Sequence, residues 1–314
     1  MDITVVGSSR TMASVLQALG KAAQCDTSVL LLGETGTGKD LAARKIHELS
    51  SRSASPFVAI NCSNLTDTFF ESELFGHTRG AFTGAVNEKS GLLEVAGNGS
   101  VFMDEIGELP LHLQAKFLRL LDKRESRKIG AIQTKIIKAR FIFATNRNLH
   151  ANVINGAFRK DLYYRINVLV IRIPSLRERK EDLPELVAHF IHRENVRNGT
   201  RKRLAPGALQ KLKKYDFPGN VRELENIVER AFVFSENELI RTQDIHLEQE
   251  GDSRSSVLTL SLVEETLQQC QWNKTRAAEK LGKSRRQLYR IMKKYQLGGN
   301  EKRVRLKGPH FIDN

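Results

Sequence analysis

The chain has 314 residues, 40% of them hydrophobic and 27% charged, and a net charge of +14 at pH 7. No apolar run approaches the roughly 18 residues of a membrane span, and the first residues lack the basic and apolar segments of a secretion signal, so we expect a cytoplasmic protein of about two domains with no membrane partner. The three cysteines, Cys25, Cys62 and Cys270, lie far apart, which excludes paired spacing for a disulfide or a metal and predicts reduced, buried side chains.

Short apolar runs alternate with helical patterns from the N-terminus to residue 174. Helical spacing is found in Lys39–His47 and in Leu111–Lys123. Strands are expected at Val29–Leu32, Phe57–Asn61, Ser100–Asp104, Ala139–Thr145 and Val168–Ile173. Because this alternation is typical of βαβ units, the sequence predicts an α/β fold, a parallel sheet with flanking crossover helices.

The first expected strand is followed by GETGTGKD, which has the phosphate-loop pattern G-x-x-x-x-G-K between a strand and a helix. Glycines let backbone N–H groups close around phosphate oxygens, and the helix N-terminus adds positive potential. Lys39 is expected to reach the outer phosphates. Asp40 stands where a phosphate loop usually has the Ser or Thr that binds magnesium, and a carboxylate can also bind this ion, directly or through water. A glycine-rich turn by chance is the alternative. The predicted nucleotide-binding residues are Gly33, Glu34, Thr35, Gly36, Thr37, Gly38, Lys39 and Asp40.

The segment ELFGHTRGAFTGA, residues 73–85, has the composition of a loop. Its last six residues are uncharged and place Phe82 among small residues and glycines, which break helices and strands. An aromatic side chain offered to water has a cost unless a partner receives it. The alternative is that Phe82 packs on its own domain.

The segment SVFMDEI, residues 100–106, is a strand that ends in two acids. Asp104 is expected to hold magnesium or its water, and Glu105 to polarise the water that attacks the γ-phosphate. A strand that merely ends in solvated acids is the alternative, which the upstream phosphate loop disfavours. Together the two motifs predict nucleotide hydrolysis with Mg²⁺ as a cofactor.

Strand signals stop after residue 174. Amphipathic helices are expected at Glu181–Glu194, Pro206–Tyr215 and Asn220–Phe234, which predicts a small helical subdomain. The polar segment Leu247–Val257, with a glycine and serines, has the composition of a linker.

The last fifth of the chain is its most basic part. Residues 251–314 carry 14 Lys and Arg against 6 Asp and Glu, which leaves 36 against 30 for the first 250 residues. This excess favours a polyanion as partner, although charge alone fits RNA or a membrane surface equally well.

A motif within this basic part favours DNA. Residues 263–297 have the pattern of a helix followed by a helix–turn–helix, with Lys274–Leu281 as the first helix of the pair, Gly282 at the turn and Arg285–Tyr295 as the recognition helix. Leu288 and Ile291 should face the core, early positions should meet base edges, and later ones phosphates. A solvated basic helix in a three-helix bundle is the alternative. The predicted DNA-binding residues are Ser284, Arg285, Arg286, Gln287, Arg290, Lys293 and Lys294.

Six segments occur in an order that is typical of one bacterial family: the phosphate loop, ELFGHTRGAFTGA, DEIGELP, FIFATNRNL, FRKDLYYRINVLVIRIPSLRER and FPGNVREL. On these segments, residues 3–297 resemble the bacterial enhancer-binding proteins, the AAA+ activators of sigma-54 RNA polymerase. GAFTGA is nearly diagnostic, an acid after the phosphate-loop lysine is usual, and Phe217 replaces the more frequent Trp. The C-terminal module resembles the Fis-type DNA-binding domain of the same activators.

The resemblance implies roles for residues that no motif alone would single out. Asn146 resembles the first sensor of the γ-phosphate, and Arg222 the second sensor. Arg159 and Arg165 resemble arginine fingers that act in a neighbouring subunit's site, where guanidinium groups offset phosphoryl charge; alone, they would more often be solvated or ion-paired helix residues. Asn61 resembles the residue that holds the catalytic glutamate in an inactive rotamer.

The resemblance also implies partners and a function. Arginine fingers that act in a neighbouring subunit require head-to-tail contacts between subunits, and such contacts close as a ring. In this family the ring is a hexamer. The expected function is binding of upstream double-stranded enhancer DNA and ATP hydrolysis that remodels the closed promoter complex of sigma-54 RNA polymerase. The loop residues that would contact sigma-54, with the glycines as hinges, are Gly80, Ala81, Phe82, Thr83, Gly84 and Ala85.

Two other functions compete with this one. A DNA-binding repressor with a vestigial ATPase would not need the intact Lys39, Asp104, Glu105 and GAFTGA. A helicase or replication loader shares the ATPase chemistry but leaves GAFTGA unexplained.

The motifs divide the chain into an α/β nucleotide-binding subdomain at 1–173, a helical lid subdomain at 174–246, a linker at 247–258, a helix–turn–helix domain at 259–298 and a basic tail at 299–314. Only a few residues precede the family pattern, so no receiver or sensory domain is expected. Control would then be absent or would come from a separate regulatory protein acting in trans.

Overall fold

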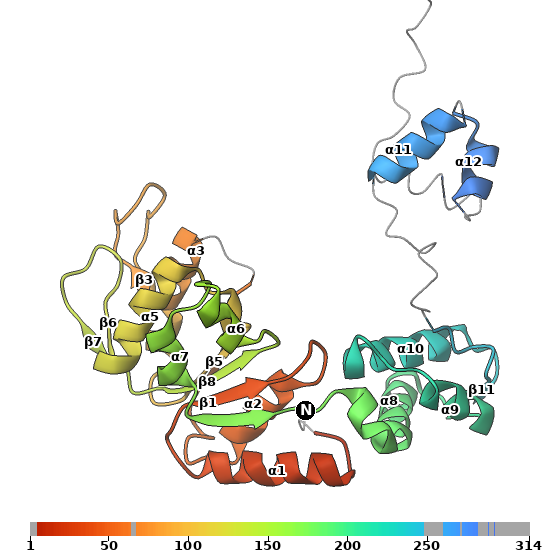
Figure 1. Cartoon of the computed structure of the whole chain (residues 1–314), viewed down its shortest axis with the longest axis horizontal. Coiled ribbons are helices and arrows are strands. Elements are labelled where there is room, and N and C mark those ends of the chain that lie inside the picture. The colour runs from red at the N-terminus through yellow and green to blue at the C-terminus, as the bar shows by residue number, and fades with distance from the viewer. Residues whose placement is uncertain are drawn as a thin grey trace, which may run out of the picture. The chain divides into compact units, whose positions relative to one another are not determined.

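The computed structural model describes residues 5–63, 67–247, 260–270, 272–281, 288 and 292. The chain forms two compact units, Met1–His246 and Leu247–Asn314 (Figure 1). No helix in the described residues is long and apolar enough to cross a membrane. The seven residues predicted to bind DNA all lie outside the described part of the chain: Ser284, Arg285, Arg286, Gln287, Arg290, Lys293 and Lys294.

The first unit is built on a parallel sheet of five strands in the order β2-β5-β8-β1-β9. Each strand is a short apolar run, and all four pairings are parallel, which confirms the predicted α/β fold. The predicted strand at 139–145 begins one residue later, the one at 168–173 is one residue shorter at each end, and the other three have the predicted bounds. The strands are β1 (Val29–Leu32), β2 (Phe57–Asn61), β5 (Ser100–Asp104), β8 (Arg140–Thr145) and β9 (Leu169–Arg172).

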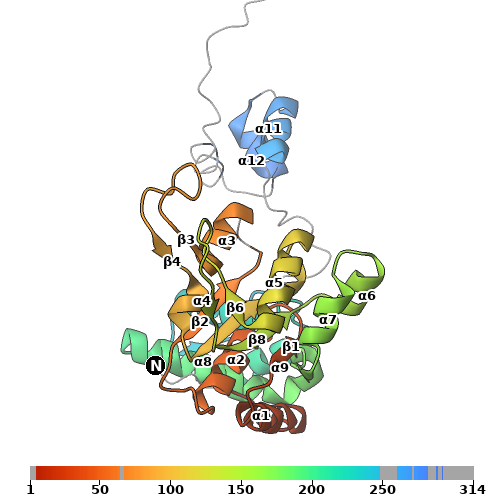
Figure 2. The same cartoon turned by 90° about the vertical axis from the view of Figure 1, so that its left-hand side faces the viewer.

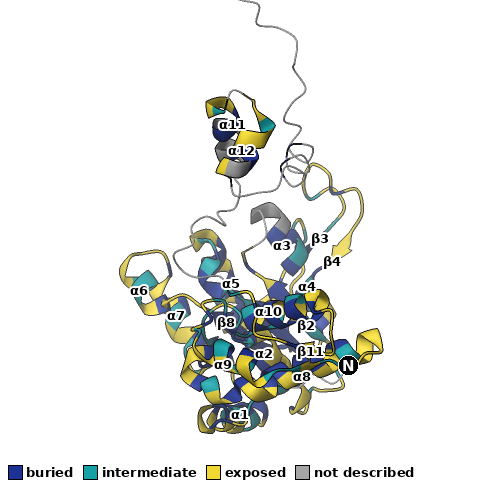
Figure 3. Cartoon of the chain, turned by 90° about the vertical axis from the view of Figure 1, so that its right-hand side faces the viewer, coloured by how far each residue is buried: buried dark blue, intermediate teal, exposed yellow. Residues whose placement is uncertain are grey.

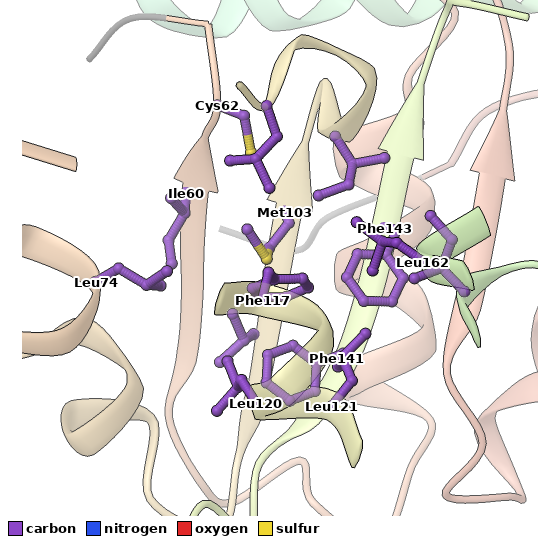
Figure 4. Close-up of a cluster of buried hydrophobic side chains, with 14 of the residues drawn as sticks. Ile60, Cys62, Leu74, Met103, Phe117, Leu120, Leu121, Phe141, Phe143 and Leu162 are labelled. Carbon is purple, nitrogen blue, oxygen red and sulfur yellow. The ribbon is translucent and has the colours of Figure 1, made fainter. Parts of the chain in front are cut away.

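Successive side chains of a strand face opposite sides of the sheet, so the unit has two hydrophobic cores. Phe141 and Phe143 of β8 belong to one core, and Ile142 and Ala144 to the other. In Figure 4, Phe117 meets both phenylalanine rings edge-on, with centroid distances of 5.7 and 5.9 Å. This core lies under α3 (Asp67–Phe75), α4 (Leu92–Ala96), α5 (Leu111–Lys123), α6 (Leu149–Ile154) and α7 (Lys160–Ile166).

The other core lies under α1 (Arg10–Ala23) and α2 (Lys39–Glu48), on the opposite side of the sheet (Figure 1). No pattern in the sequence had indicated α1. Its Ser9 side chain caps the helix by accepting from the N–H of Met12. The helix then buries Met12, Val15 and Leu19.

Two short antiparallel pairs hold long loops beside each other. One pair is β3 (Gly76–His77) with β4 (Lys89–Ser90), and the other is β6 (Glu125–Ser126) with β7 (Lys135–Ile136). The N–H of Thr78 donates to the carbonyl of Ile129 at 3.0 Å, so the bases of the two loops are joined. Figure 2 shows both loops leaving the sheet together.

The helical subdomain follows β9. It contains η2 (Leu176–Asp182), α8 (Leu183–Asn198), α9 (Pro206–Lys213) and α10 (Asn220–Phe234). The predicted bounds of α10 are confirmed, whereas the helix predicted at Glu181–Glu194 begins at Leu183 and continues to Asn198. Pro184 fits the first turn because that turn needs no N–H, and Gly199 ends the helix with φ +66°.

Strands do not stop after residue 174, as the sequence had suggested. β10 (Arg203–Leu204) and β11 (Leu239–Ile240) form a two-residue parallel pair in the helical subdomain. Segments of two residues are too short to have a period that sequence analysis can detect.

In the second unit, α11 (Leu260–Gln269) and α12 (Lys274–Lys280) pack around a small core. Ala277 and Ala278 are buried there, and so is Leu288, as its predicted place facing the core requires. Of the three cysteines, only Cys62 is buried; Cys25 is exposed and Cys270 half-buried, which corrects the expectation that all three are core residues. Figure 3 shows how burial is distributed along the chain.

Candidate active site and exposed loop

The loop between β1 and α2 is shaped by glycines around one lysine. Gly36 and Gly38 have φ of +79° and +92°, a conformation that favours glycine. Lys39 is buried. Its Nζ donates to the carbonyl oxygens of Gly33 and Glu34 at 2.9 and 3.2 Å. The lysine predicted to reach phosphates is therefore held inside the curve of the loop.

The predicted carboxylates lie beside this lysine. Asp104 ends β5, and Glu105 follows with φ +52°, a strained backbone for a residue with a side chain. Glu105 Oε1 is 3.5 Å from Lys39 Nζ, and Oε2 accepts the N–H of Asn146 at 3.1 Å. The Asn146 carboxamide donates to Thr35 Oγ1 at 2.9 Å. Parallel strands explain this meeting, because β1, β5 and β8 are neighbours whose carboxyl ends share one edge of the sheet.

Negative charge accumulates at this edge. Burial raises the pKa of Asp104, and the neighbouring charges of Glu105 and Asp40 raise it further, while Lys39 lowers it. Burial, with smaller contributions from Asp104 and Glu105, raises the pKa of the Cys62 thiol to about 12. A cation bound near Asp104 would relieve this repulsion.

The raised pKa of Asp104 predicts a stability effect. Its protonated form stabilises the fold below the pKa of the unfolded chain, and this contribution is lost as pH rises through the higher folded-state pKa. At pH 7.5 the ionised carboxylate therefore destabilises the ligand-free fold, so Asp104→Asn should raise Tm by a few degrees. Scanning calorimetry without nucleotide at pH 7.5 and pH 5 measures both the gain and its expected decrease in acid.

The matched control for this prediction is Asp26→Asn. A hydrogen bond from Arg52 lowers the pKa of Asp26, so the amide at that position should leave Tm unchanged or reduce it slightly, since the pair is exposed. A lower Tm for Asp104→Asn would contradict the assignment of Asp104 as a destabilised carboxylate.

The amino end of α10 lies on the phosphate loop. The carbonyl of Gly36 accepts the N–H groups of Val221 and Arg222 at 3.0 and 3.3 Å. A Cβ at Gly36 would lie 2.3 Å from the carbonyl oxygen of Gly219, so a side chain there would displace the helical subdomain. The backbone of Arg222, the predicted second sensor, therefore lies beside the phosphate loop. Its guanidinium makes no ion pair with any residue that the structure describes.

Other predicted residues are not brought to this loop. Arg159 pairs with Asp161, with N–O distances of 2.7 and 3.0 Å, and Arg165 pairs with Asp122 at 3.1 Å. Both arginines are exposed, so their predicted action in a neighbouring subunit's site stays a prediction. Asn61 uses its carboxamide oxygen to accept a backbone N–H two residues on, at 2.8 Å, and Glu105 takes other partners.

The GAFTGA segment forms a closed loop between β3 and β4. The N–H of Gly80 donates to the carbonyl of Ala85 at 2.8 Å. Gly80 and Gly84 have φ of +79° and +103°, and neither has a neighbour within 4 Å of an added Cβ. Phe82 is 41% exposed and meets the His77 ring edge-on, with centroids 5.0 Å apart. The aromatic side chain thus touches its own domain along one edge and offers the rest to solvent.

The residues present fit a nucleotide with Mg²⁺. Lys39 supplies a buried cation, Gly36 and Gly38 open the backbone, and Asp104 and Asp40 supply hard oxygen ligands. No group of three or more His, Cys, Asp or Glu side chains converges among the described residues. Mg²⁺ is typically held by one or two carboxylates and completes its shell with phosphate oxygens and water.

Three family models match consecutive parts of the chain. The model of the sigma-54 interaction domain matches residues 5–172, that of the AAA+ ATPase lid domain matches 177–261, and that of the Fis family of bacterial regulatory proteins matches 261–295. The first match alone covers more than half of the chain. The chain belongs to the AAA+ activators of sigma-54 RNA polymerase.

Curated relatives and solved structures agree with this family. The chain is 39% identical to the response regulator PilR of Pseudomonas aeruginosa over 311 residues, covering 93% of this chain and 70% of PilR. It is 43% identical to the Nif-specific regulatory protein of Klebsiella pneumoniae over 304 residues, covering 91% of this chain and 58% of that protein. NtrX of Brucella abortus, solved with ADP, has a TM-score of 0.73 at 30% identity and covers 95% of this chain and 70% of its own.

This sigma-54 activator chain therefore spans about three fifths to seven tenths of the length of these relatives. The fold class and family inferred from its sequence are confirmed.

Sequence analysis of this activator missed the contacts that join the helical subdomain to the phosphate loop. Glu34 was singled out only as a loop residue, yet its carboxylate pairs with Arg177 and accepts from Asn220. Arg179 was not considered; it is buried, and its Nη2 donates to the carbonyl of Thr37 at 3.2 Å. The asparagine in GNVREL was the available signal, because asparagine before a helix often indicates a special backbone position.

Proposed function

We propose that this chain is an ATP-driven activator that binds upstream double-stranded DNA and remodels the closed promoter complex of sigma-54 RNA polymerase. The observation that carries the proposal is the presence, in one α/β unit, of a loop that exposes Phe82 and of Lys39, Glu105 and Asn146 gathered at a phosphate loop. The family of the chain supports it, and NtrX, solved with ADP, supports an adenine nucleotide as the ligand.

In this mechanism the loop N–H groups and Lys39 bind the phosphates of ATP. Asp104 and Asp40 would hold Mg²⁺, which when bound supplies positive charge against the phosphate oxygens. Glu105 accepts a proton from the attacking water, because Lys39 and the Asn146 N–H hold its carboxylate beside the phosphate loop. Asn146 and Arg222 would respond to the γ-phosphate from two sides of the loop.

The proposal includes a ring. Arg159 and Arg165 are exposed on and before α7. If they exchange their partners Asp161 and Asp122 for the nucleotide of a neighbouring subunit, the head-to-tail contacts close as a ring, in this family a hexamer. Release of Asn61 from its own backbone would let it reach Glu105 in another nucleotide state. Hydrolysis would then move the loop of residues 80–85 against sigma-54.

We propose the domain division at residues 173, 246, 258 and 298 that the motifs predict. The residues proposed to hold DNA are Ser284, Arg285, Arg286, Gln287, Arg290, Lys293 and Lys294. The match of the Fis family model to residues 261–295 supports the DNA-binding part. The protein would act in the bacterial cytoplasm, and a separate regulatory protein acting in trans is a candidate for its control.

The test is a trapped complex. The purified chain is incubated with ADP, Mg²⁺ and aluminium fluoride, a phosphate mimic, and binding to sigma-54 is measured by gel filtration and light scattering. A complex that depends on the mimic supports the activator. ATP turnover without any complex would instead support a repressor or a machine with another client.

A further inference from the structure

Asn220 is unusual among the residues of the helical subdomain. It is fully buried and has φ +55°, a left-handed backbone that asparagine tolerates better than most residues. Its carboxamide uses both ends. Oδ1 accepts the N–H of Leu176 at 2.8 Å, and Nδ2 donates to Glu34 Oε2 at 3.1 Å and to the carbonyl of Thr35 at 3.0 Å.

Glu34 is the second residue of the phosphate loop and faces the same subdomain. Its carboxylate accepts from both terminal nitrogens of Arg177, one of them at 2.8 Å, besides accepting from Asn220. The hydrogen bond from Arg177, followed by the one from Asn220, lowers the pKa of Glu34. An ionised acceptor makes the hydrogen bond from Asn220 a strong one.

The backbone of the loop completes the connection. The carbonyl of Gly36 accepts two N–H groups from the first turn of α10, which would otherwise have no partner inside the helix. The loop residues 34–36 are therefore held by the helical subdomain through a side-chain carboxylate and two carbonyl groups. Those same residues must present their N–H groups to phosphate.

We propose that Asn220 and Glu34 form a latch that holds α10 on the phosphate loop and keeps the loop in its phosphate-binding conformation. Asn220 is then a positioning residue, which acts on the nucleotide only through Glu34 and Thr35. The latch also places Arg222, two residues further on, beside the site. This inference rests on the proposed nucleotide chemistry but concerns a residue that none of the motifs assigned.

An isosteric exchange of donor and acceptor tests the latch. Asn220→Asp keeps the volume, the tolerance of φ > 0 and the acceptor for Leu176, but it replaces the donor by an anion that faces Glu34. In the double variant Asn220→Asp with Glu34→Gln, the new amide at position 34 can donate to the new carboxylate at position 220, which restores one hydrogen bond in the opposite direction. Asn195→Asp is the matched control, since Asn195 donates to the carbonyl of Lys202 at 2.9 Å within the helical subdomain and does not contact the loop.

Two measurements are made on the full chain: the Kd for a fluorescent ADP, and amide hydrogen exchange of residues 219–224 without nucleotide. Asn220→Asp should raise the Kd about tenfold, the usual scale for losing a hydrogen bond to a charged group, and should accelerate exchange of the α10 first turn. The double variant should recover most of both losses, and Asn195→Asp should change neither.

Unchanged Kd and exchange in Asn220→Asp, or losses that simply add in the double variant, would overturn the latch. If the wild-type chain itself binds no ADP, the proposed nucleotide function fails. Hydrogen exchange, which needs no nucleotide, then decides alone whether the latch exists.

Discussion

Replacement of Glu105 by glutamine should lower the kcat of ATP hydrolysis by about 10²- to 10⁴-fold, the range that a positioned general base contributes, and should leave ATP binding nearly unchanged. Glutamine has the same size, and its amide oxygen can still accept the N–H of Asn146, which donates to Glu105 at 3.1 Å. It cannot accept a proton from water at neutral pH. Steady-state turnover and the Kd for a fluorescent ATP analogue measure the two quantities.

Glu108→Gln is the control for this variant. Glu108 lies three residues further along, in the short helix η1 (Ile106–Glu108), and pairs with Arg147. It has no contact with Lys39 or Asn146 among the described interactions, so its turnover should stay close to that of the wild type. If Glu105→Gln kept a large part of the wild-type kcat, another residue would have to activate the water.

Replacement of Phe82 by alanine should abolish the sigma-54 complex trapped with ADP and aluminium fluoride, while ATP turnover persists. Phe82 lies in an exposed loop and packs on the His77 ring, so we expect its truncation to leave the rest of the domain folded. A buried aromatic anchor at an interface commonly contributes 2 kcal/mol or more, which corresponds to a loss of affinity of roughly 30-fold or greater. Gel filtration of the trapped mixture and ATPase assays on the same preparation measure both effects.

Val86→Ala is the control, because Val86 is an apolar side chain that is 71% exposed just beyond the loop. It should keep the complex. A Phe82→Ala chain that still bound sigma-54 as tightly as Val86→Ala would show that the aromatic side chain is not the contact. A loss of ATPase in Phe82→Ala would point instead to a structural role through His77.

The comparison of sequence and structure is clearest where a pattern is long. The runs at Val29–Leu32 and Ser100–Asp104 and the periodic segment Leu111–Lys123 have the bounds that their patterns predict. The prediction was less accurate for the ends of helices, such as those of α8 (Leu183–Asn198). The start of α8 depends on Pro184 and on Asp182. The carboxylate of Asp182 accepts the N–H groups of Ser8 and Ser9 at 2.9 and 2.7 Å, so it binds the segment before α1, which is distant in sequence.

The candidate site divides in the same way. Lys39, Asp104 and Glu105 belong to contiguous motifs whose chemistry is visible in the residues themselves, and parallel strand ends bring them together by a general rule. Asn146 and Arg222 were assigned through resemblance to a family, since one amide or one guanidinium has no signature of its own. The partnership of Glu34 with Arg177 and Asn220 joins residues more than 140 positions apart, and no local pattern records such a distance.

The sequence by itself determined the α/β class, the phosphate loop, the acidic strand end and the family, because each of these depends on neighbouring residues and on the period of the chain. Only the tertiary structure decided which groups satisfy one another across the two subdomains. Gly36 must be glycine because the carbonyl of Gly219 would lie 2.3 Å from its Cβ. Asn220 accepts a left-handed backbone because its buried carboxamide has partners on both sides. Such requirements arise from close packing and from hydrogen bonds that buried polar groups must find in the folded chain.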